Sequence, residues 1–212
     1  MELLLRQERP EDFRAVEELT RAAFWNRYVP GCTEHYFLRR MRSHPDFVPG
    51  LDYVALSDGT LVGSIVYCRS AIRRADDSTL PTLTFGPLSV LPDFQGRGVG
   101  SALVRKTLSL AAKSSAAAVV ITGDPRYYHR LGFRSAEKWD ITDGDGFYSP
   151  ALMALPLRPG ALDHGAGRFV EPEVFSHFGQ AEFDAYDATF PPLERGPSET
   201  QRDFAFLSQL RY

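Results

Sequence analysis

The chain of 212 residues has few cysteines, no long apolar run and no large excess of one charge. Its two cysteines, Cys32 and Cys68, do not form a disulfide framework and favour the reducing cytoplasm. No apolar run approaches the roughly 20 residues that cross a bilayer. Residues 1–6 are too short and too acidic a start for a signal peptide. These absences predict a cytoplasmic protein with no membrane partner.

The charge balance gives no sign of a nucleic-acid partner. Lys and Arg number 24 and Asp and Glu 27, so the formal net charge is −3. The basic cluster of Arg39, Arg40 and Arg42 is interpreted as a solvated helix face. No spacing of His, Cys, Asp and Glu indicates a metal site. The length and the ordinary hydrophobic content of 43% instead predict one globular domain with an appendage.

Hydrophobic periodicity and turn residues predict alternating strands and helices. We expect strands at 3–6, 52–56, 61–72, 79–90, 117–121, 133–139 and 151–157. We expect helices at 10–24, 33–42, 99–113 and 126–131. Three consecutive strands with short turns between 52 and 90 favour antiparallel pairing within a mixed sheet.

The most informative segment runs from residue 88 to 104. Leu88, Ser89 and Val90 end a strand, and Gly96, Gly98 and Gly100 then occupy alternate positions before an amphipathic helix. Glycine allows positive φ and lets a ligand approach the backbone closely. A helix N-terminus presents free N–H groups and a partial positive charge. The segment therefore predicts a phosphate-binding loop.

Several loop types are compatible with such glycines. A dinucleotide-binding loop requires a third glycine where Ser101 stands, and an acidic residue about twenty positions later, but residues 116–120 contain no acid. A triphosphatase loop requires a lysine before Ser101, and Gly100 stands there. A glycine-rich turn without a ligand is the remaining structural alternative.

The run Gln95-Gly96-Arg97-Gly98-Val99-Gly100 resembles the Gln/Arg-x-x-Gly-x-Gly/Ala loop of the GNAT superfamily of N-acetyltransferases. The resemblance covers residues 1–157 and implies the GNAT fold, an α/β architecture with a central, mixed, mostly antiparallel sheet flanked by helices. It also implies acetyl-coenzyme A (acetyl-CoA) as cosubstrate. The residues that it assigns to the coenzyme are Leu88, Ser89, Val90, Gln95, Gly96, Arg97, Gly98, Val99, Gly100 and Ser101.

The resemblance gives these residues different roles. The backbone N–H groups of 95–100 would hold the pyrophosphate, and Ser101 would add its hydroxyl. Leu88, Ser89 and Val90 would pair with the pantetheine arm, because this strand splays from its neighbour in the family. The N–H of Val90 would face the thioester carbonyl, where a preorganised donor lowers a barrier by about 3 kcal/mol.

Residues 127–133 resemble the family's Tyr-x-x-x-Gly-Phe segment, which implies that Tyr128 is the acid for the leaving thiolate. A phenol of pKa near 10 can protonate a thiolate whose conjugate acid has a pKa near 8.5. Tyr127 is the other candidate for this acid, and a role in packing alone is the alternative for Tyr128. His129 is interpreted as a surface residue, because helical geometry turns it about 100° away from Tyr128.

Other parts of the chemistry are less specified. Glu34 and Asp52 are candidates for the base that deprotonates the amine. Tyr67 and Arg69 lie two apart on one strand and are candidates for the acceptor pocket, although structural pairing explains them equally well.

Residues 158–212 differ in character from the preceding domain and form a C-terminal extension. Its aromatic residues require apolar surface, which the core or a partner subunit would supply, and a lid over the substrate site is the alternative. Exposed aromatics favour a homodimer. Ser198 and Gln201 have the spacing of a capping box at the start of a helix.

The sequence thus predicts an N-acetyltransferase that transfers acetyl from acetyl-CoA to a primary amine by direct attack in a ternary complex. The acceptor is a small-molecule amine or a protein amine. The alternative from another class is a catalytically silent CoA-binding sensor or partner protein. Transfer to a hydroxyl, or from a longer acyl donor, is left open.

Overall fold

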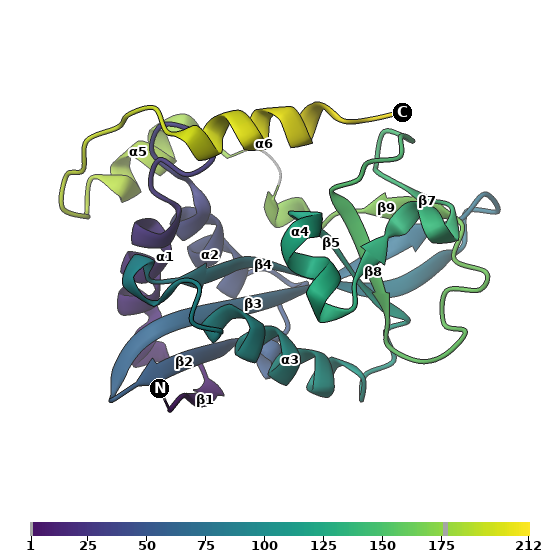
Figure 1. Cartoon of the computed structure of the whole chain (residues 1–212), viewed down its shortest axis with the longest axis horizontal. Helices are drawn as coiled ribbons and strands as arrows, with labels where there is room; N and C mark the ends of the chain where they lie inside the picture. Colours follow the sequence, from purple (N-terminus) through teal and green to yellow (C-terminus); the bar gives the residue numbers. More distant parts are fainter. Residues whose placement is uncertain (1, 176–177) are drawn as a thin grey trace.

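The computed structural model describes residues 2–175 and 178–212 and contains one nine-stranded sheet (Figure 1). The strands are β1 (Leu4–Gln7), β2 (Tyr53–Ser57), β3 (Thr60–Arg73), β4 (Thr79–Val90), β5 (Ala118–Thr122), β6 (Arg134–Ser135), β7 (Ile141–Thr142), β8 (Leu152–Pro156) and β9 (Gly167–Val170). The helices are α1 (Phe13–Phe24), α2 (Glu34–Arg42), α3 (Val99–Ala111), α4 (Pro125–Tyr128), α5 (Gln180–Asp187) and α6 (Glu199–Gln209).

The sheet has the strand order β1-β2-β3-β4-β5-β8-β6, with β9 added to the far end of β3 and β7 paired to β9. Neighbours from β1 to β4 are antiparallel, whereas β4 and β5 are parallel. The predicted fold class, a mixed and mostly antiparallel sheet flanked by helices, is confirmed. In the described part of the chain, no helix combines the length and the apolar character that crossing a bilayer requires.

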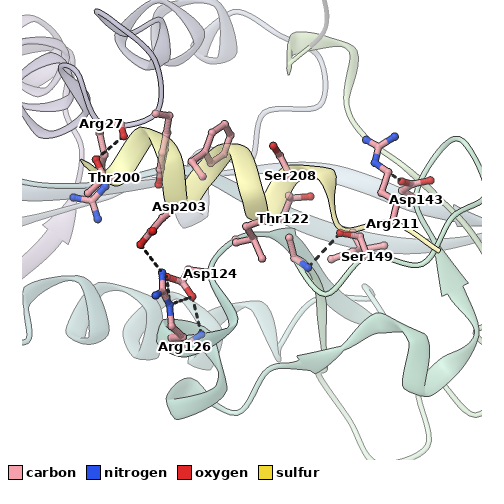
Figure 2. A pocket seen from close by; sticks show the side chains of 16 residues that line it. Arg27, Thr122, Asp124, Arg126, Asp143, Ser149, Thr200, Asp203, Ser208 and Arg211 are labelled. Atoms are coloured by element: carbon pink, nitrogen blue, oxygen red, sulfur yellow. Dashed lines mark hydrogen bonds and ion pairs between the residues drawn. The ribbon is translucent and has the colours of Figure 1, made fainter. Parts of the chain in front are cut away.

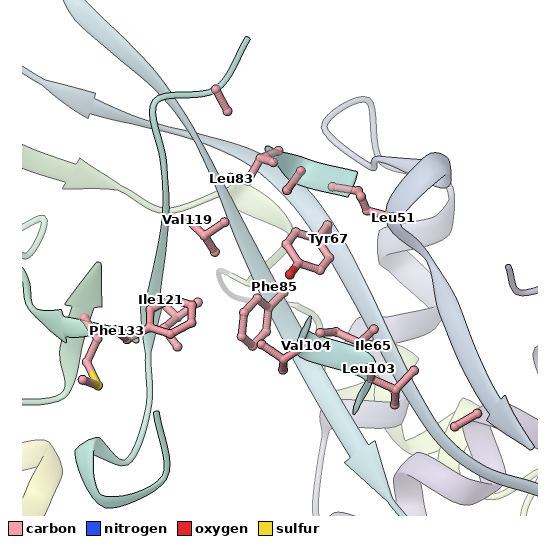
Figure 3. Packing of buried hydrophobic residues seen from close by; sticks show 14 of the residues in the cluster. Leu51, Ile65, Tyr67, Leu83, Phe85, Leu103, Val104, Val119, Ile121 and Phe133 are labelled. Atoms are coloured by element: carbon pink, nitrogen blue, oxygen red, sulfur yellow. The ribbon is translucent and has the colours of Figure 1, made fainter. Parts of the chain in front are cut away.

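The alternation of side chains along β2 and β3 builds a hydrophobic core on each face of the sheet. Val54, Val66 and Cys68 pack with α1 and α2 on one face. Ile65 and Tyr67, at the intervening positions, pack on the opposite face with α3, β5 and Phe85 of β4 (Figure 3). The helices thereby hold β4 and the segment that follows it from both sides.

Strands β4 and β5 diverge toward their carboxyl ends. They pair at a single position, Leu83 with Val119, near the start of β5. Beyond it, β4 continues to pair with β3 as far as Val90, opposite Gly63, while β5 pairs on its other side with β8. The C-terminal part of β4 therefore has backbone groups on the side of β5 that pair with no strand of the described chain.

Two local predictions are wrong. The strand expected at 133–139 is β6, Arg134–Ser135, followed by a 3₁₀ turn over Ala136–Trp139, because the partner β8 pairs with it at only two positions. The capping box expected at Ser198 is absent. Its hydroxyl and the Gln201 side chain donate instead to the carbonyl of Asn26, at 2.6 and 3.0 Å.

The basic cluster on α2 is not uniformly solvated. The Arg42 side chain is 7% exposed, and its guanidinium lies 2.6 Å from both Glu8 and Glu17. An arginine between two carboxylates compensates their charges in a buried setting. Arg42 therefore joins α2 to α1 and to the segment after β1.

The segment after β9 packs on α1 and α2. Phe183, Tyr186 and Phe190 are buried around Tyr36 of α2. Asp187 lies 2.8 Å from the guanidinium of Arg21 and 3.0 Å from His35 Nε2. Helix α6 then runs from the α1–α2 side toward β7 (Figure 1).

Candidate functional site

The loop between β4 and α3 has the backbone conformation that its glycines permit. Gly96 and Gly98 have φ of +73° and +88°, and a Cβ at either position would meet nothing within 4 Å. The left-handed conformation, rather than lack of space, therefore requires glycine here. Gly98 is also the N-cap residue of α3.

The N–H groups of this loop are available to a ligand. Those of residues 96–101 donate to no acceptor in the described part of the chain, whereas the N–H of Gln95 donates to the Pro92 carbonyl at 3.2 Å. The dipole of α3 adds partial positive charge at the same place. The side chains of Arg97 and Ser101 flank this row, Arg97 exposed and Ser101 half-buried.

Val90 has its N–H on the open edge of β4. The N–H of the next residue, Leu91, donates to Val62 of β3 at 3.0 Å, and successive N–H groups of a strand point to opposite sides. The carbonyl of Val90 accepts from Gln95 Nε2 at 3.1 Å. Ser89 is buried, with its hydroxyl 2.9 Å from that of Thr20, and Leu88 is half-buried.

Tyr127 of α4 reaches the start of α3. Its hydroxyl lies 3.4 Å from Ser101 Oγ, and a Cβ on Gly100 would lie 2.8 Å from that hydroxyl oxygen. The third glycine of the loop therefore provides room for Tyr127 rather than a special backbone conformation.

Tyr128 points into the core between β4 and β5. Its ring centroid lies 5.8 Å from that of Phe85 and 5.7 Å from that of Phe133. Burial raises the pKa of its hydroxyl above the ordinary value, so the phenol keeps its proton at neutral pH. The neighbouring His129 is exposed, as predicted.

A cavity of about 310 Å³ lies beside this region, at the carboxyl end of β5 (Figure 2). Thr122, Gly123 and Asp124 form one wall, and α6 crosses the cavity. The Tyr128 ring packs so closely on Gly123 that a Cβ there would collide with it. Gly123 therefore lines the cavity and also contacts the Tyr128 ring.

Some candidates lie elsewhere. Tyr67 is fully buried with its hydroxyl 3.0 Å from that of Thr107, so it fills the core and lines no acceptor pocket. Arg69 donates to the Pro45 carbonyl at 2.9 Å. Asp52 is buried beside Glu8, and its burial, with the hydrogen bond to Glu8, raises its pKa.

Glu34 is placed differently from Asp52. Its carboxylate accepts from the N–H of Thr33, the N-cap residue of α2, at 3.0 Å. Burial raises the pKa of Glu34. It is not among the described residues that line the cavity.

The other side of the cavity consists of residues that no sequence motif marked. Arg27 and Tyr28 come from the α1–α2 connection, and Phe204 comes from α6. The Arg27 guanidinium also lies 3.4 Å from Gln95 Oε1 of the glycine loop. These residues meet through the fold, across more than 170 positions of sequence, so a local pattern could not have found them.

Residues 50–135 match the family model of the acetyltransferase (GNAT) domain. The uncharacterised N-acetyltransferase YjhQ of Escherichia coli is 34% identical over 108 residues, which are 51% of this chain and 55% of YjhQ. The chain thus spans about half of the length of that relative. The uncharacterised N-acetyltransferase YhbS of the same organism is 29% identical over 177 residues, 83% of this chain and all of YhbS.

Solved structures agree with these relatives. The crystal structure of E. coli YhbS in complex with CoA has a TM-score of 0.72 at 26% identity, and the match covers 84% of this chain and 93% of that one. A GNAT acetyltransferase of Brucella melitensis in complex with acetyl-CoA has a TM-score of 0.66 at 26% identity, covering 82% and 99%. Residues 50–135 thus match the GNAT acetyltransferase domain, and the fold of the chain is that of the two GNAT structures.

Proposed function

We propose that this protein is an acetyl-CoA-dependent N-acetyltransferase that acts on a primary amine by direct attack in a ternary complex. The observation that carries the proposal is the row of available N–H groups at residues 96–101, next to the open edge of β4 at Val90. The CoA and acetyl-CoA complexes of the two similar proteins support it.

The loop fits the pyrophosphate of the coenzyme. Free N–H groups at a helix N-terminus bind phosphate oxygens, and the space above Gly96 and Gly98 is open. We assign the pyrophosphate to the N–H groups of residues 96–100, with Ser101 adding its hydroxyl. Gln95 contributes by its side chain, which holds the Val90 carbonyl, because its own N–H is engaged by Pro92.

The open edge of β4 fits the pantetheine arm. We assign the arm to the backbone of Leu88, Ser89 and Val90, which pairs with β3 alone. The N–H of Val90 points to this edge and is the donor that we assign to the thioester carbonyl oxygen. Such a donor stabilises the developing oxyanion by about 3 kcal/mol.

Bound acetyl-CoA supplies the activated acetyl thioester, whose C–S bond breaks as the amine nitrogen bonds to the acetyl carbon. Tyr128 is the group that we assign to donate its hydroxyl proton to the departing sulfur. Its raised pKa keeps that proton available over the whole neutral range. The proton lost by the amine passes to solvent, and Tyr128 takes up a proton from solvent to regain its hydroxyl before the next turnover.

Thermal denaturation with acetyl-CoA, CoA and NAD tests the coenzyme assignment. A ligand at 100 times its Kd stabilises the protein by about 2.7 kcal/mol. We expect both coenzyme A forms, but not NAD, to raise the Tm. Gly98→Glu should abolish this shift, because it places a carboxylate where the phosphates bind.

Gly50→Glu is the matched control, because Gly50 lies in open space outside the loop. Each variant is compared with its own ligand-free Tm, so a general loss of stability does not mimic a loss of binding. Absence of any shift with the wild-type protein contradicts the proposal. Binding without turnover of any amine favours the silent CoA-binding protein instead.

A further inference from the structure

Helix α6 is attached to the domain at both ends and spans the cavity between them. At its start, the hydroxyls of Ser198 and Thr200 donate to the carbonyls of Asn26 and Arg27, at 2.6 and 2.7 Å. After its end, the backbones of Tyr148 and Tyr212 exchange hydrogen bonds of 2.9 and 3.2 Å. None of the described residues of α6 is fully buried. The helix is therefore a wall fixed by its ends rather than a packed core element.

The middle of α6 faces the cavity with apolar side chains. Phe204 and Leu207, three positions apart, both line it. The Phe204 ring centroid lies 4.5 Å from that of Tyr28 in the α1–α2 connection, with 31° between the ring planes. The aromatic pair joins α6 to the opposite wall of the cavity.

The carboxylates around the cavity already have cationic partners (Figure 2). Arg126 lies 2.8 Å from Asp124 and 3.7 Å from Asp203. The Asp143 carboxylate lies 3.4 Å from the Arg211 guanidinium. A ligand that carries a charged group besides its reacting amine would lose the hydration of that group, which would have to compete with these existing ion pairs. An uncharged apolar body has Phe204, Leu207 and Tyr28 to contact.

We propose that this cavity takes the acceptor and that α6 restricts acceptors to small-molecule amines with an aromatic or aliphatic body. This inference rests on the proposed function. The volume of about 310 Å³ is at the lower end of the range for small-molecule sites. A polypeptide would have to pass beneath a helix that is attached at both ends. Phe204 is then a specificity-determining residue.

The test compares kcat/KM for 2-phenylethylamine and hexylamine with that for peptides carrying a free N-terminus or a lysine. The assay follows thiol release from acetyl-CoA by the full chain. We expect the two small amines to exceed every peptide by at least 100-fold. Phe204→Trp should lower kcat/KM for 2-phenylethylamine at least tenfold, mainly through KM, because the larger ring occupies the cavity.

Phe206→Ala is the matched control, because Phe206 lies on the same helix, is 67% exposed and is not among the described residues that line the cavity. It should leave all rates within twofold of wild type. An unchanged acetyl-CoA-induced Tm shift shows that each variant is folded and binds the coenzyme.

Three results overturn the inference while leaving the proposed function intact. The first is that peptides are acetylated as efficiently as the small amines. The second is that the Phe204 and Phe206 variants have the same kinetics. The third is that acetyl-CoA stabilises the protein but neither small amine reacts. Failure of acetyl-CoA to raise the Tm of the wild type instead overturns the proposed function, and the inference falls with it.

Discussion

Adjacent residues of the short helix α4 have separate environments. The Tyr127 hydroxyl reaches the start of α3, 3.4 Å from Ser101 Oγ, while the half-buried Tyr128 ring packs between Phe85 and Phe133. Adjacent helical residues point about 100° apart. One tyrosine therefore faces the start of α3, where we propose that phosphate binds, and the other packs on Phe85 of β4.

We predict that Tyr128→Phe lowers kcat by about 100-fold, the lower end of the range for a lost general acid. The acetyl-CoA-induced Tm shift should stay unchanged, because the hydroxyl does not contact the phosphate loop. Because burial raises the pKa of Tyr128, the wild-type kcat should show no loss from its ionisation below about pH 10. Steady-state kinetics against pH measures both.

Tyr127→Phe separates the two tyrosines. It removes a hydroxyl near Ser101 and should affect the KM for acetyl-CoA more than kcat. A large loss of kcat in this variant, with little loss in Tyr128→Phe, would assign the acid to Tyr127.

At the scale of elements, α3 is held against β3 by a close approach at Gly63. A Cβ there would lie 2.8 Å from Val99 Cγ1 and 3.1 Å from Leu103 Cδ1. Val99 and Leu103 lie in the first turns of α3, directly after the glycine loop. The position of the loop thus depends on the packing of its helix on the sheet.

We predict that Gly63→Ala lowers the free energy of unfolding by about 1–3 kcal/mol, the usual cost of overpacking a core. Gly50→Ala, where the Cβ meets nothing within 4 Å, should change it by less than about 0.5 kcal/mol. Urea denaturation measures both variants. Equal costs at the two positions would show that α3 adjusts freely to the added methyl group.

At the scale of the whole molecule, a buried ionic cluster attaches the C-terminal segment to the domain. His35 is fully buried, lies 3.0 Å from Asp187, and has its Nδ1 3.6 Å from Cys32 Sγ. Burial lowers the pKa of His35 from 6.5 to about 4, against the opposing effect of Asp187, while Arg21 adds to the lowering. The folded state therefore resists protonation of His35.

We predict that acid detaches this segment. Because the folded pKa is lowered, the stabilisation is complete above pH 6.5 and is lost as the pH falls toward about 4. The loss is at most about 1.4 kcal/mol per pH unit for one proton. The lowered pKa of Asp187 acts in the same direction at lower pH.

Trp25 is the reporter for this transition, since its Nε1 donates to the Glu194 carbonyl at 2.9 Å. In a Trp139→Phe background, its emission should change between pH 6.5 and 4. His35→Gln cannot take up the proton and should flatten this part of the titration. An identical titration in both proteins would assign the transition to another group.

Features that neighbouring residues specify could be predicted from the sequence. Gly96 and Gly98 adopt positive φ, and α3 begins where the pattern predicts, because backbone conformation and helix initiation are local properties. The strands β2 and β3 could be predicted for the same reason, because alternating hydrophobicity is a property of neighbouring residues. The fold class and the family resemblance follow from such short-range patterns.

Features that depend on distant partners could not be predicted in this way. The Arg42 side chain lies between Glu8 and Glu17, and the buried Tyr67 hydroxyl pairs with that of Thr107. Ser198 forms no capping box because its hydroxyl donates to the Asn26 carbonyl. The cavity is lined by Tyr28 and Phe204, which are 176 positions apart in the chain. No sequence pattern specifies such contacts, because they form only when separate elements pack against one another.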